Sequence, residues 1–181
     1  MVDKYKDIKP QDIVNTEKIS EDMQLIHVNM KSPEEEYEDS YLLTMAGGSW
    51  YVASGGIVSR QKSVYTEEQV KDGEVGIYLQ NIYHAFNGID TYVINIVNNT
   101  SEILRIGFVN NGAIIYENNA GKEYVDFETT LELSPYNSGE IYFTANSNEG
   151  LVKTITLKEV MLGLQAQTSD VEVLMGEMMD Y

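Results

Sequence analysis

The chain has 181 residues, no cysteine, and 29 acidic against 12 basic residues, which gives a formal net charge of −17. This length suits one domain with an extension and is sufficient to bury a substantial core. The negative charge repels phosphate backbones and anionic lipids, so it argues against binding to nucleic acid or to an anionic membrane. The missing cysteines exclude disulfides and thiolate metal sites.

The first 45 residues differ from the rest of the chain. Most of them are polar or charged, and residues 34–39 form an acidic run. Residues 24–30 could make a strand, because apolar side chains alternate there. The region as a whole is too poor in apolar residues to fold by itself. We therefore expect residues 1–45 to be an extended arm that lies on another surface.

From residue 46 onward, short alternating segments are separated by turn residues. The clearest is residues 123–133, which place four apolar side chains on one face: Val125, Phe127, Leu131 and Leu133. Period-two alternation is typical of a half-buried strand. Similar patterns predict further strands at residues 57–65, 74–81, 90–98, 102–109, 113–117, 139–146 and 151–162.

Many short strands joined by tight turns indicate two stacked sheets. The fold class that we predict is all-β, a jelly-roll β-sandwich over residues 46–166. The Asn-Gly pair at 111–112 tolerates the positive φ of a hairpin turn, so strands 102–109 and 113–117 should pair directly.

The last segment, residues 167–181, is too apolar for a free tail, and its Val, Leu and Met side chains predict a further strand or short helix that packs on the sandwich or on a neighbour. No apolar run follows Met1, so we expect no secretory signal. No stretch reaches the ~18 apolar residues that a membrane span requires.

Catalytic patterns are weak in this chain. The acids are spread over loops and outward strand positions, and nothing singles out a pair held roughly 5–9 Å apart, as a glycosidase requires. There is no Gly-x-Ser-x-Gly elbow, and the only histidines are His27 and His84, which we interpret as packing or surface residues. We expect no catalytic residues and no enzymatic activity.

Metal binding is limited by the same composition. Two histidines 57 positions apart do not predict a transition-metal site. Calcium needs only oxygen ligands, and Asp72 with Glu74, or Asp170 with Glu172, could contribute them. Without a recognisable ligand loop, we predict no cofactor and no metal ligands and keep a structural calcium ion as the alternative.

The outward strand positions carry residues suited to sugar recognition. If the apolar positions face inward, the outward positions include Tyr78, Gln80, Asn95, Arg105 and Tyr142. A tyrosine ring offers an apolar platform to a sugar, while amides and a guanidinium bond its hydroxyls. The alternative is that these tyrosines pair across strands and only stabilise the sheet. We take the five residues as the candidate glycan-binding set.

A family likeness becomes visible in residues 48–59, where Gly-Ser-Trp-Tyr-Val-Ala-Ser-Gly-Gly-Ile-Val-Ser resembles the opening of galactose-binding-like, carbohydrate-binding-module jelly rolls. Residues 92–97 are similar to an aromatic-led strand of these modules. Residues 154–162 are similar to their closing strand, in the form found in bacteriophage tail and adhesion proteins. The calcium-binding acid that such modules carry near their first strand has no counterpart here.

The resemblance implies a non-enzymatic structural accessory protein of a bacteriophage virion, with a carbohydrate-binding-like module that aids adhesion to host glycans. It implies other virion structural proteins as partners, together with a homo-oligomeric or arrayed state. A stand-alone glycan-binding module is the alternative, and a glycan-modifying enzyme is a more remote one. Size-exclusion chromatography separates the first two, since a lone module should be monomeric.

Overall fold

The computed structural model describes residues 9–19, 21–33, 35–53, 56–107, 113–126, 130–163 and 169–180. Within these ranges every regular element is a strand or a single-turn 3₁₀ segment, namely η2 (Glu67–Gln69) and η3 (Ser147–Glu149). The prediction of an all-β protein is therefore confirmed. In the described part of the chain, no helix has the length and apolarity needed to cross a membrane.

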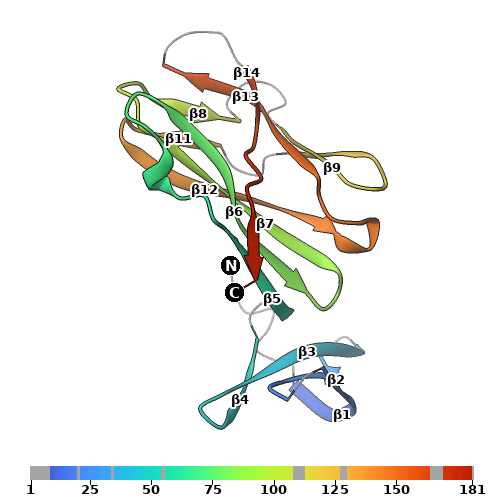
Figure 1. Ribbon diagram of the computed structural model, residues 1–181. Helices are drawn as coiled ribbons and strands as arrows, with labels where there is room; N and C mark the ends of the chain where they lie inside the picture. The colour runs from blue at the N-terminus through green and yellow to red at the C-terminus, as the bar shows by residue number, and fades with distance from the viewer. Residues whose placement is uncertain are drawn as a thin grey trace. The chain divides into compact units, whose positions relative to one another are not determined.

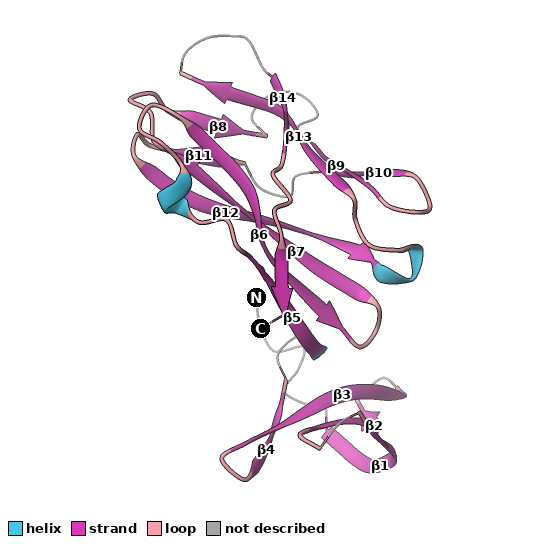
Figure 2. Cartoon of the chain, in the orientation of Figure 1, coloured by secondary structure: helices cyan, strands magenta, loops and turns pink. Residues whose placement is uncertain are grey.

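The chain divides into two compact units, shown in Figures 1 and 2. We call residues 1–58 with 85–87 the N-terminal unit. We call residues 59–84 with 88–181 the sandwich unit.

The N-terminal unit is a four-stranded antiparallel sheet with the order β1 (Lys9–Lys18), β2 (Met23–Lys31), β3 (Glu36–Ala46) and β4 (Ser49–Val52). This sheet stands where the sequence predicted an extended arm. Residues 23–31 pair with residues 36–44 without a break, so the strands are held together mainly by backbone hydrogen bonds. Among the side chains whose burial the structure describes, Val28, Met30 and Leu42 alone are buried in it. This is why its apolar pattern was too sparse to reveal it.

The sandwich unit consists of two sheets around one core. The five-stranded sheet has the order β12 (Asn137–Asn146), β7 (Ile89–Asn98), β6 (Val75–Ala85), β5 (Ile57–Ser63) and β15 (Met178–Asp180). The other sheet has the order β10 (Lys122–Asp126), β9 (Ala113–Glu117), β13 (Thr154–Leu162), β8 (Leu104–Ile106) and β11 (Leu131–Leu133), with β14 (Ser169–Glu172) also paired to β13.

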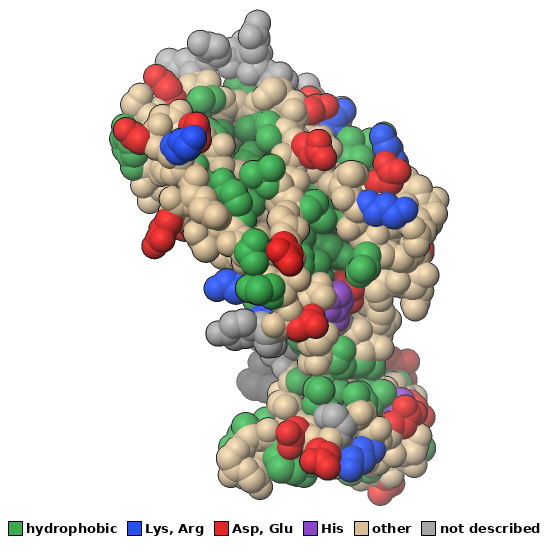
Figure 3. Space-filling view, viewed as in Figure 1, with side chains coloured by type: hydrophobic (Ala, Val, Ile, Leu, Met, Phe, Trp, Pro, Cys, Tyr) green, Lys and Arg blue, Asp and Glu red, His purple; other side chains and the backbone are tan. Residues whose placement is uncertain are grey.

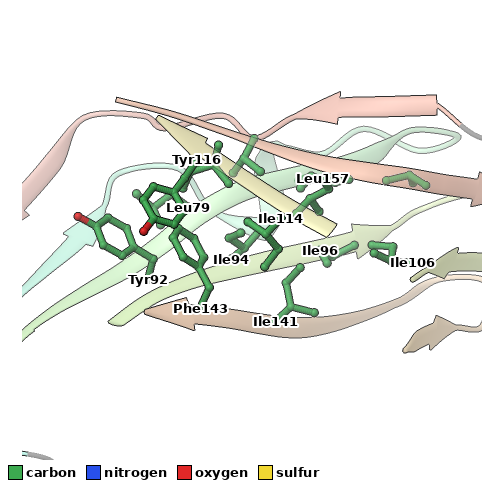
Figure 4. Packing of buried hydrophobic residues seen from close by; sticks show 14 of the residues in the cluster. Leu79, Tyr92, Ile94, Ile96, Ile106, Ile114, Tyr116, Ile141, Phe143 and Leu157 are labelled. Carbon is green, nitrogen blue, oxygen red and sulfur yellow. The ribbon is translucent and has the colours of Figure 1, made fainter. Parts of the chain in front are cut away.

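The core lies between these sheets, as Figure 4 shows. Phe143 of β12 stacks on Tyr92 of β7 and on Tyr116 of β9, with ring centroids 5.1 Å apart in both pairs. Since Tyr116 belongs to the opposite sheet, this ring stack joins the two layers. The inward positions predicted for strands 74–81, 90–98 and 139–146 are confirmed, and the fully buried ones include Leu79, Ile94 and Ile96.

Two predicted strand arrangements are wrong. The segment 123–133 is not one strand: β10 pairs with β9, whereas β11 pairs with β8. β8 and β9 do not pair with each other in the described residues, because both pair with the longer β13. Phe127 and the turn at 110–112 lie outside the described residues.

The C-terminal segment joins both sheets. β14 pairs with β13, and β15 pairs with β5. Between them, Leu174 donates its backbone N–H to the Ile77 carbonyl (3.0 Å), and its own carbonyl accepts from Leu79 (2.9 Å). Val173 is 2% exposed in the core. The described part of residues 167–181 is therefore part of the sandwich.

Candidate functional site

The predicted glycan-binding residues Tyr78 and Asn95 lie opposite each other on β6 and β7. Both point away from the main core, as expected, but each is only 2% exposed. The Asn95 amide donates hydrogen bonds to the Tyr78 hydroxyl (2.6 Å) and to Oε1 of Glu67 (3.1 Å). These two side chains are therefore covered and are not available to a sugar.

Tyr78 and Asn95 are covered by the connection between β5 and β6, residues 64–74. Its Val70 is 6% exposed and forms a second apolar cluster with Tyr78 and Val97. The Tyr65 ring packs on the Tyr78 ring with a centroid distance of 4.7 Å. Burial accordingly raises the pKa of the Tyr78 phenol, an effect that the hydrogen bond from Asn95 partly opposes.

Gly76 makes this close approach feasible. A Cβ built at Gly76 would overlap the Cγ2 methyl of Val70. A residue without a side chain is thus required for the connection to lie directly on the sheet. The Asn99 amide fixes the same segment by donating to the Val70 carbonyl at 2.7 Å.

The other three predicted residues are dispersed. Arg105 lies on β8 in the opposite sheet, where its Nε donates to Oε2 of Glu132 at 2.8 Å. Gln80 is half-buried at an irregularity in the β6–β7 register and accepts a hydrogen bond from the Asn81 amide. Tyr142 on β12 is 70% exposed. The five residues therefore do not form one surface.

A smaller candidate surface remains around Tyr142. Tyr142 lies opposite Val93 of β7, and Val93 lies opposite Asn81 of β6, so the three side chains form a row across the sheet. Glu140 and Thr144 flank Tyr142 on its own strand and are exposed. The exposed ring can stack on a sugar, while the Glu140 carboxylate on the same strand and the Asn81 amide at the far end of the row can bond its hydroxyls. Asn81 was not predicted, because the register shift between Leu79 and Asn81 has no sequence signature.

His27 is held within the N-terminal unit. Its Nδ1 is 2.9 Å from the Ser40 hydroxyl, and its Nε2 is 3.5 Å from Oε1 of Glu17. A hydroxyl, an imidazole and a carboxylate are thus in one row. Acyl transfer also requires a place for the substrate. One described hollow of this unit, about 350 Å³, is lined by Gln11, Asp12, Asn29, Met30, Glu36, Tyr37 and Glu38, and neither His27 nor Ser40 is among these residues.

His84 and the acids considered for calcium are arranged differently. His84 Nδ1 lies 2.7 Å from Oδ2 of the buried Asp90 at the β6–β7 hairpin. Asp72 and Glu74 are exposed in the turn before β6, and Asp170 lies 3.9 Å from the Lys158 ammonium. Among the residues with described positions, no three His, Asp or Glu side chains are grouped so that they could hold a metal ion.

Comparisons of the chain with protein-family models, with curated proteins and with solved structures gave no match.

Proposed function

We propose that the chain is a non-enzymatic structural accessory protein of a bacteriophage virion. Its sandwich is proposed to be a carbohydrate-binding-like module of the jelly-roll type that aids adhesion to host glycans. The exposed Tyr142 ring on the outer face of the five-stranded sheet carries the glycan part of this proposal. The virion part rests on the resemblance of residues 154–162 to the closing strand found in phage tail and adhesion proteins, whereas residues 48–59 resemble carbohydrate-binding modules in general.

Attachment to the particle is assigned to the N-terminal unit. Its buried set is small, and both faces of its sheet carry exposed side chains. Such a sheet is well suited to adding a strand to a neighbour or receiving one. We propose that this unit has the docking role expected of an arm, with other virion structural proteins as its partners.

Glycan binding is tested with an array probed by the full chain and by two single-tyrosine variants. Tyr142→Ala removes the proposed platform, whereas Tyr124→Ala removes a ring that is 67% exposed on β10 of the other sheet. We expect at least about a tenfold loss of affinity for the first variant and no change for the second. Equal losses for both variants, or no binding by the wild type, would remove the glycan role.

The virion role has a separate test. Mass spectrometry of density-purified particles from the host that carries the gene should detect this chain at a fixed ratio to the capsid protein. A chain found only in the particle-free fraction would favour the stand-alone glycan-binding module. Turnover of a polysaccharide by the pure protein would contradict the non-enzymatic assignment.

A further inference from the structure

The longest stretch of the chain without a charged residue runs from Ser40 to Ser59, 20 residues in a chain that is 23% charged. β4 lies within this stretch. It exposes three large apolar side chains in succession: Trp50 (38%), Tyr51 (56%) and Val52 (61%). Interface cores are depleted in charge and enriched in aromatic residues, so this composition is typical of a contact surface.

β4 is also an edge strand, since within the described residues it pairs only with β3. Natural sheets protect their edges with charges, prolines, bulges or very short strands. β1, the other edge of the same sheet, is a long strand that carries the first three kinds of protection: four charged residues, Pro10 and two register shifts. The remaining edge strands that the structure describes each carry at least one charged residue: β10, β11, β12, β14 and β15. β4 has none.

The backbone of β4 has N–H and C=O groups on the side that faces away from β3. The Ala53 N–H donates to the Leu42 carbonyl at 2.7 Å, and Val52 lies opposite Leu43. Because successive N–H groups of a strand point to opposite sides, the N–H of Tyr51 also faces β3. The N–H and C=O groups of Trp50 and Val52 therefore face away from β3, ready to bond another strand.

The net charge of the chain restricts which of its surfaces can contact a second copy. Two copies of a chain with a net charge of −17 repel each other, and acidic side chains are scattered over the surface in Figure 3. Self-association therefore requires a surface that carries no charge, and the edge of β4 within the stretch 40–59 meets that requirement. A two-fold axis perpendicular to the sheet would pair β4 with β4 of a second copy in the antiparallel sense.

We infer that β4 is a self-association edge: two copies of the chain join their N-terminal sheets through antiparallel pairing of residues 49–52. This rests on the virion role proposed above, for which the resemblance implies a homo-oligomeric or arrayed state, and it does not depend on glycan binding. Pairing four residues buries less surface than the ~1,000 Å² that a stable interface buries, so the association is weak and depends on concentration. Copies arrayed on a particle would be held together by many such contacts.

Sedimentation of the full chain tests the inference, over concentrations from about 5 to about 500 µM. The wild type should shift from monomer to dimer in this range. Val52→Pro removes an outward donor while the β3–β4 bonds remain, and Tyr51→Lys adds the protection that other edges have. Each should weaken dimerisation at least tenfold. Val14→Lys on β1, at a position 53% exposed, should leave it unchanged.

The lysine variants also separate edge pairing from general repulsion. Each lysine reduces the net negative charge, so general repulsion between copies falls in Tyr51→Lys and Val14→Lys alike. A dimer lost only in Tyr51→Lys must therefore have used the β4 edge. Circular dichroism of each variant should show an unchanged strand spectrum, which excludes unfolding as the cause.

A disulfide experiment adds a positional readout. The chain has no cysteine, so a single cysteine can bond only to its own copy in the partner molecule. Cysteine placed in turn at Ser49, Trp50, Tyr51 and Val52 should give one variant that oxidises to a covalent dimer, because one position lies nearest the two-fold axis. Asn15→Cys on β1 should remain monomeric.

Three results would overturn the inference. The first is a wild type that stays monomeric to about 500 µM. If that monomer binds zwitterionic vesicles, the β4 edge is a lipid contact instead of a contact between copies. The second is a dimer that survives both Val52→Pro and Tyr51→Lys. The third is cross-linking through Asn15→Cys alone. Glycan binding lost in Tyr142→Ala with dimerisation intact would show that the two sites act independently, so that failure of one proposal leaves the other standing.

Discussion

Tyr142 and Phe143 are neighbours on β12, yet the first is 70% exposed and the second is 3% exposed. Successive side chains of a strand leave on opposite faces, so one peptide unit separates the core of the sandwich from its outer surface. The same strand thus contributes both to the ring stack that joins the sheets and to the proposed glycan platform.

Phe143→Ala and Tyr142→Ala form a matched pair for stability. Phe143→Ala removes the central ring of the stack and leaves a cavity, so the free energy of unfolding should fall by about 3–5 kcal/mol. Tyr142→Ala should change it by about 0.5 kcal/mol or less, because that ring is in solvent. Urea denaturation followed by circular dichroism measures both. Similar losses in the two variants would contradict the orientation of β12.

Gly76 and Val70 should be energetically coupled. In Gly76→Ala the new methyl group meets Val70, so the connection at 64–74 must lift from the sheet, at a cost of roughly 1–3 kcal/mol. Hydrogen exchange of the residues in this connection should accelerate. The double variant Gly76→Ala, Val70→Ala should be less destabilised than the sum of the single variants, by about 1 kcal/mol. Additive effects would show that the two residues do not share this contact.

Asn98 connects three segments at one end of the sandwich. This residue is 0% exposed, and its amide donates to the carbonyls of Glu102 (2.8 Å), Leu133 (3.3 Å) and Ser134 (3.1 Å). Asn98→Ala leaves buried polar groups without partners and should cost about 2–3 kcal/mol in urea denaturation. The control is Asn137→Ala, because Asn137 lies opposite Asn98 and is exposed. A cost equal to that of the control would refute the structural role of Asn98.

Alkaline pH should destabilise the sandwich through its buried tyrosines. Burial raises the pKa values of Tyr78, Tyr92 and Tyr116 above the ordinary 10.0. The folded state then keeps these phenol protons where the unfolded chain releases them. Their contribution is complete below pH 10 and is lost as the pH rises through the folded-state values.

The measurement is the free energy of unfolding from urea curves at pH 8 to 12, together with phenolate absorbance. The decline above pH 10 should be shallower in Tyr116→Phe, which removes one raised pKa and keeps the stacked ring. Tyr124→Phe, an exposed position, should not change it. A decline that is identical in all three proteins would exclude ionisation of Tyr116 as a cause.

Several features of the site depend on contacts that no local pattern contains. Tyr78 and Asn95 were correctly placed on the outer face of the sheet, but the connection at 64–74 folds over them. Arg105 has the same outward orientation but belongs to the opposite sheet. Which strands become neighbours depends on long-range pairing, and the sequence of one strand does not encode its partner.

The amino-acid sequence alone determined that the sandwich is built of strands and, where the alternation is regular, which side chains point inward, as Ile141, Tyr142 and Phe143 illustrate. This succeeds because the two-residue period is a local property of the backbone. Only the tertiary structure decided that β8 and β9 both pair with β13, that β1 to β4 form a sheet, and which outward side chains meet solvent. Those outcomes depend on backbone hydrogen bonds and packing between segments far apart in the chain.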